Sequence, residues 1–85
     1  MEYIITFKTT NRAIKAEQCL LECDISVGVA PLPSQIKAGC GICLRIKPDQ
    51  LEVALQILAD NVDEYGLYSR AMQDGKYTYK GEEIK

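Results

Sequence analysis

Alternation of apolar and polar positions predicts strands along much of the chain. Residues 3–8 and 40–47 alternate with a period of two, so each segment would turn one set of side chains towards a core. The core-facing set has odd numbers in the first segment and even numbers in the second. The segments 25–30 and 67–72 are short and largely apolar, and they also predict strands.

Two other segments have the period of an amphipathic helix. Residues up to 23, starting at Asn11 or Arg12, follow cap-type residues and gather their apolar side chains on one arc of a helical wheel. A second helix is predicted from Pro48, a residue suited to a first helical turn, and Gly66 would end it. Its apolar positions recur at helical spacing: Leu51, Ala54, Leu55, Leu58 and Val62.

The order of these elements predicts the fold class. Strand–helix–strand–strand–helix–strand is the ferredoxin-like, split βαβ arrangement: an α+β fold with two helices on one face of a four-stranded antiparallel sheet. Its first and third strands are central, and its other face would be a mixed surface. The pair Asp74–Gly75 signals a C-terminal hairpin extension, with a short fifth strand at residues 77–79. We expect one domain over residues 1–80 and a flexible tail over residues 81–85.

Composition and charge exclude several classes of function. The 85 residues are 47% hydrophobic and 26% charged, which is ordinary for a globular protein. A net charge of −2 gives no attraction to nucleic acid or to an anionic membrane. No apolar run approaches the roughly 20 residues of a membrane span, and the N-terminus does not resemble a signal peptide, so we expect a cytoplasmic protein. The chain has no His, the commonest general base and a common zinc ligand.

Cys40 is the candidate functional residue. It lies where the Pro- and Gly-containing loop 31–39 would enter a strand, between Gly39 and Gly41. These glycines would permit a positive φ and close approach of a partner to the sulfur. Lys37, three residues upstream, could favour the thiolate by lowering the thiol pKa. The alternative is that Cys40 only packs as a small apolar residue.

The other cysteines allow a redox or a metal-binding interpretation. Cys40 and Cys43 form a Cys-x-x-Cys pair, but positions three apart in an extended strand are about 10 Å apart and on opposite faces. That separation is too large for a disulfide. Cys19 and Cys23 form a second pair, at a spacing close to that of structural zinc sites. Because both fall in an apolar helical arc, we favour packing over ligation.

Glu17 lies inside the apolar arc of the first predicted helix. A carboxylate there needs a partner. An ion pair with a Lys or Arg at the sheet edge is favoured, and the alternative is that Glu17 accepts hydrogen bonds from N–H groups of the loop carrying Cys40. The chain contains no nucleotide-binding motif, and we expect neither a cofactor nor a metal.

Residues 31–46 resemble the selenium/sulfur carrier protein-like family of small bacterial proteins. In that family a first strand ends in Phe, a helix contains Ala and Glu, and Pro-x-Pro with a short spacer precedes Cys-Gly and an apolar strand. The matching residues here are Phe7, Ala16, Glu17, Pro31, Pro33, Cys40, Gly41 and Leu44. The resemblance covers about residues 3–72. It departs from the pattern at Ser34, where the family is often basic, and at the extra thiol of Cys43.

The resemblance implies a thiol carrier rather than a complete enzyme. Cys40 would hold a sulfur or selenium atom as a persulfide or perselenide, beside Gly39 and Gly41, with Lys37 stabilising the thiolate and Glu17 ordering the loop. Its partners would be donor and acceptor proteins. Two alternatives stay open: a regulatory or assembly module that forms a homodimer through its sheet, and a metal-binding protein with cysteine ligands.

Overall fold

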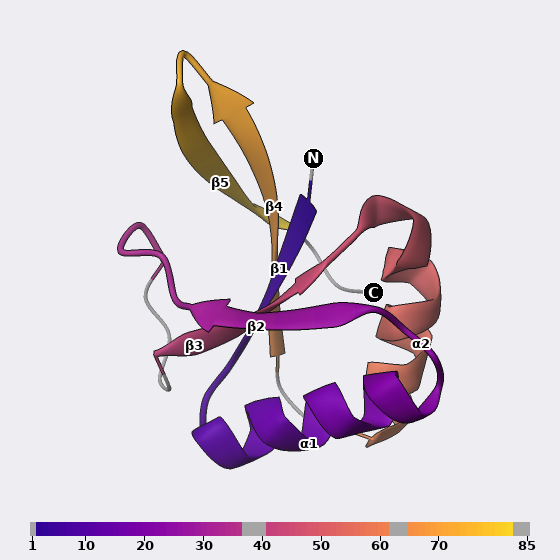
Figure 1. Cartoon of the computed structure of the whole chain (residues 1–85). Helices are drawn as coiled ribbons and strands as arrows, with labels where there is room; N and C mark the ends of the chain where they lie inside the picture. The colour runs from indigo at the N-terminus through magenta and orange to yellow at the C-terminus, as the bar shows by residue number, and fades with distance from the viewer. Residues whose placement is uncertain (1, 37–40, 62–64, 83–85) are drawn as a thin grey trace.

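A computed structural model describes residues 2–36, 41–61 and 65–82. In chain order its elements are β1 (Glu2–Phe7), α1 (Thr10–Glu22), β2 (Val27–Pro31), β3 (Ile42–Ile46), a short 3-10 turn (Pro48–Gln50), α2 (Leu51–Asn61), β4 (Tyr65–Gln73) and β5 (Lys76–Glu82) (Figure 1).

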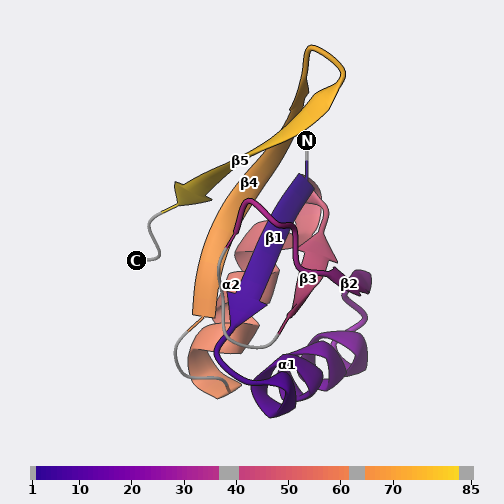
Figure 2. The same ribbon diagram turned by 90° about the vertical axis from the view of Figure 1, so that its left-hand side faces the viewer.

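The strands form one antiparallel sheet in the order β2-β3-β1-β4-β5. Figure 2 shows β1 beside β4, with β5 on the other side of β4. The part of the chain that is described is therefore an α+β fold with two helices and five strands. The sheet has one strand more than the four expected. The additional strand, β5, forms the anticipated hairpin with β4.

One face of the sheet packs against the helices, as the alternation predicted. Ile5 and Phe7 of β1 share a buried cluster with Leu44 and Ile46 of β3. The other buried members of this cluster are Ala13, Ala16 and Leu20 of α1, Ala54 and Leu58 of α2, Ile25 and Leu67. We call this side of the sheet the helix face, and the other side the helix-free face. The cluster is the main core because apolar side chains from both layers exclude water from it.

Local capping fixes the ends of α1. The Thr9 hydroxyl accepts a hydrogen bond from the Arg12 backbone N–H at 3.2 Å, which satisfies a donor that the first turn leaves unpaired. At the other end, Asp24 has a φ of 61°, and the N–H of Ile25 donates to the Leu20 carbonyl at 2.9 Å. This left-handed turn ends the helix.

Gly66 does not end a helix, contrary to the sequence prediction. It lies within β4, paired with Thr6 of β1, while α2 is described only to Asn61. Val62, expected in that helix, is outside the described residues. A Cβ at Gly66 would lie 2.6 Å from the Thr6 hydroxyl oxygen. The glycine is therefore explained by the close approach of β1 and β4.

The hairpin of β4 and β5 is longer than its sequence signal indicated. Asp74 and Gly75 both have positive φ values, 52° and 77°, as a two-residue hairpin turn of this type requires. β5 runs two residues past position 80, where we expected a tail. The hairpin extends beyond the N-terminal end of β1 (Figure 1). No helix among the described residues is long and apolar enough to cross a membrane.

Candidate functional site

The predicted site residues are only partly described. Cys40, Gly39 and Lys37 lie outside the described residues, whereas Gly41 and Glu17 are within them. Two described chain segments flank positions 37–40. These segments are residues 32–36, after β2, and Gly41, before β3.

Gly41 has the backbone conformation that glycine adopts readily. Its φ is +75°, it is exposed, and a Cβ placed on it would meet no atom within 4 Å. Its carbonyl accepts a hydrogen bond from the Leu32 N–H at 2.9 Å. This bond ties the residue after Cys40 to the residue after Pro31. β3 begins only at Ile42, two residues later than predicted.

Residues 32–36 fold onto the helix-free face of the sheet. The N–H of Ile36 donates to the Pro33 carbonyl at 3.0 Å, which closes a turn. The Ile36 side chain is 5% exposed and packs with Ile4 of β1 and Cys43 of β3. Partly buried neighbours complete this second cluster: Ala30, Leu32, Tyr68 and Tyr79. The segment that leads to Cys40 is thereby anchored to the sheet.

The covering of the helix-free face by this segment was not part of the expected mixed surface. Ile4 and Cys43 are each 1% exposed, and Thr6 is also buried. The Cys43 Sγ donates a hydrogen bond to the Pro31 carbonyl oxygen, at 3.7 Å. Sequence reasoning missed this burial because the covering residues come from a segment without periodicity. The Pro-rich composition suggested a loop but not where it would pack.

Glu17 lies on α1 and is half-buried. Its carboxylate makes neither a hydrogen bond nor an ion pair with any residue in the described ranges, so the expected ion pair is not seen there. α1 contributes to the helix-face core, while Ile36 packs on the opposite side of the sheet. Contact of Glu17 with the loop carrying Cys40 involves positions outside the described residues.

The cysteines do not assemble into the four-thiolate site considered above. Cys19 lies on α1 and Cys23 caps its C-terminus, on the helix side, whereas Cys43 is buried on the helix-free face. Among the described cysteines, the sheet separates the sulfur atoms of Cys19 and Cys23 from that of Cys43. No group of three or more metal-ligating side chains occurs among the described residues.

The fold and the arrangement of its loop define a class. It is a small α+β protein in which the Pro-x-Pro segment is hydrogen-bonded to a glycine with a positive φ. A family model described as "Putative Se/S carrier protein-like" matches residues 2–69. The chain belongs to this family, as its sequence resemblance indicated. The match ends within β4, so most of the hairpin lies beyond it. No curated protein and no solved structure matches the chain.

Proposed function

We propose that this protein carries sulfur or selenium, with Cys40 as the carrier thiol. The observation that carries the proposal is the family match over residues 2–69. Local geometry supports it. Gly41 leaves open space next to Cys40 in the sequence, and Ile36 anchors the other flank of the same segment. A carrier thiol needs such access, because its sulfur must be reached by two different proteins in turn.

The transfer step proceeds without an external oxidant. The Cys40 thiolate attacks the terminal sulfur of a persulfide on a donor protein. The S–S bond of the donor breaks, its thiolate leaves, and Cys40 becomes the persulfide. Transfer to an acceptor thiolate repeats the same exchange. The ammonium of Lys37 would favour the reactive thiolate, and a cytoplasmic setting would keep it reduced.

The proposal includes a ferredoxin-like core. The order βαββαβ, with β1 and β3 between β2 and β4, supports this assignment, and β5 would be an addition at one edge. An assembly module that dimerises through the helix-free face of its sheet is less well supported. That face is already covered by residues 32–36 around Ile4 and Cys43.

Sulfur loading of the purified, reduced protein tests the proposal. After treatment with a low-molecular-weight persulfide, we expect one added sulfur atom at Cys40 by mass spectrometry. Fragment ions are needed, because trypsin cleaves after Lys37 and Arg45 and leaves Cys40 and Cys43 in one peptide. The Cys40→Ser variant should gain no sulfur in that peptide.

Cys23→Ser is the matched control, because it removes an exposed thiol outside the motif. It should accept sulfur at Cys40 as the wild type does. Labelling of Cys23 alone in the wild type, or equal labelling of the peptide in Cys40→Ser, would overturn the assignment of Cys40.

A further inference from the structure

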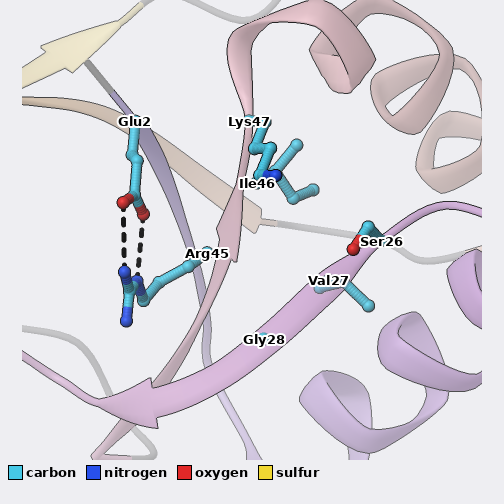
Figure 3. Close-up of a pocket in the computed structure, with 7 residues that line it drawn as sticks. All are labelled: Glu2, Ser26, Val27, Gly28, Arg45, Ile46 and Lys47. Atoms are coloured by element: carbon cyan, nitrogen blue, oxygen red, sulfur yellow. Dashed lines mark hydrogen bonds and ion pairs between the residues drawn. The ribbon is translucent and has the colours of Figure 1, made fainter.

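A charged cluster occupies the helix-free face at the end of β1 remote from Gly41. Glu2 lies between two arginines from neighbouring strands. Arg45 of β3 donates from Nε and Nη2 to the Glu2 carboxylate, both at 3.0 Å, and Nη2 of Arg70 on β4 lies 2.8 Å from the Glu2 Oε1. Figure 3 shows the side chains of Glu2 and Arg45 extended towards each other.

A hollow of about 250 Å³ adjoins this cluster between β2 and β3. Gly28 is the register partner of Arg45, and a Cβ there would meet nothing within 4 Å, so no side chain fills the space opposite the guanidinium. Ser26 and Lys47 flank the next register pair, Val27 and Ile46. The lining residues are Glu2, Ser26, Val27, Gly28, Arg45, Ile46 and Lys47.

The hollow has an excess of positive charge and of hydrogen-bond donors. Its lining includes two cations, Arg45 and Lys47, and one carboxylate, that of Glu2, in a chain whose net charge is −2. Arg70 also pairs with Glu2 but is outside this lining. Within the described ranges, neither the Nη1 of Arg45 nor the ammonium of Lys47 has a hydrogen-bond acceptor. The Ser26 hydroxyl likewise has no such partner there, since only its N–H donates, to Gln50 at 3.2 Å.

A smaller hollow on the other side of Glu2 is less suited to a ligand. It is lined by Glu2, Arg70, Ala71, Met72 and Tyr77. The guanidinium carbon of Arg70 lies 4.3 Å from the centre of the Tyr77 ring, so this arginine is held by both the ring and Glu2. Arg70 therefore helps to orient Glu2, and the hollow next to Arg45 retains the accessible donors.

We propose that the hollow between β2 and β3 binds a small inorganic oxyanion. Arg45 would donate from Nη1 while its Nε and Nη2 keep Glu2, and the flexible, exposed side chain of Lys47 would supply the second charge. Glu2 limits the affinity, because its carboxylate competes for Arg45 and repels the ligand. This site is separate from the proposed carrier thiol and does not depend on it.

Nuclear magnetic resonance titration with inorganic phosphate, and separately with thiosulfate, tests the site at constant ionic strength. We expect saturable shifts at the Gly28 amide and the Arg45 Nε–H, in the wild type and equally in Cys40→Ser. Arg45→Gln should abolish the saturation. Glu2→Gln should raise the association constant about fivefold, the scale of one exposed charge pair.

Lys47→Gln should weaken binding about fivefold on the same scale. Lys76→Gln is its matched control: it removes an equal charge from β5, outside the hollow, and should change the association constant little. Sodium acetate forms the comparison arm, and equal saturation with acetate would assign the site to carboxylates instead of inorganic oxyanions. Linear shifts with every anion, or equal effects of Lys47→Gln and Lys76→Gln, would overturn the proposal. Because these titrations succeed or fail in Cys40→Ser as well, their outcome is separable from that of the sulfur-loading experiment.

Discussion

The two faces of the sheet are closed in different ways. On the helix face, α1 and α2 lay long apolar surfaces over β1 and β3. On the helix-free face, a short segment with a single fully anchored side chain, Ile36, covers Ile4 and Cys43, and the remote end is charged. Burial on the first face is spread over two regular elements. Burial on the second depends on a few contacts, so we expect that face to open at a lower free energy than the main core.

Truncation in the helix face should have the largest effect. Leu20 is fully buried between α1 and the sheet, so Leu20→Ala should lower the free energy of unfolding by about 2–5 kcal/mol. Leu21 is its neighbour in the same helix and is 51% exposed, so Leu21→Ala should cost less than about 1 kcal/mol. Urea denaturation measures both. Equal losses would show that the helix face is not the main core.

Truncation of the anchor on the helix-free face should have a smaller and more local effect. Ile36→Ala removes the side chain over Cys43, and we expect a loss of about 1–3 kcal/mol. Native-state alkylation of Cys43, followed by mass spectrometry in a Cys40→Ser background, should become faster. Gln35→Ala, an exposed change in the same segment, is the control. A Cys43 thiol that stays equally protected in Ile36→Ala would argue against this covering role.

The charged end of the helix-free face should respond to pH. The hydrogen bond from Arg45, with the nearby charge of Arg70, lowers the pKa of Glu2 below its usual value of 4.5 against the opposing effect of desolvation. A carboxylate with a lowered pKa in the folded state contributes stability above its unfolded pKa, and this contribution disappears as the pH falls through the folded pKa.

Comparison of the wild type with Glu2→Gln measures this contribution. Because Glu2 and Arg45 are partly exposed, we expect a difference of about 0.2–1 kcal/mol at neutral pH, shrinking progressively below about pH 4.5. Urea denaturation at several pH values provides the measurement. A difference that does not change with pH would mean that the ion pair adds nothing to stability.

The sequence was informative where periodicity and packing agree. Alternation correctly identified Ile5, Phe7, Leu44 and Ile46 as core residues of the helix face, because regular elements repeat the same contact. Residues 31–39 have no such period, so the burial of Ile36 and Cys43 could not be foreseen from composition. Gly66 was misinterpreted because the sequence alone does not distinguish a glycine that permits close strand contact from a glycine that ends a helix.

The features of the candidate site were likewise predictable from the sequence only in part. The glycine pair around Cys40 allowed a left-handed backbone, and Gly41 has one. By contrast, the cluster of Glu2, Arg45 and Arg70 depends on strand register, since its members are far apart along the chain. Individual charged residues on a strand give no sign of it, because the pairing of three strands brings them together.

The outer strand β2 also affects how the molecule behaves at high concentration. An unpaired strand edge can recruit strands from other molecules and so start aggregation. β2 is only five residues long and ends in Pro31, which has no backbone N–H to donate. At the opposite edge, β5 includes Lys76 and Lys80, both exposed. Short length and proline at one edge, and lysines at the other, disfavour growth of the sheet into fibrous assemblies.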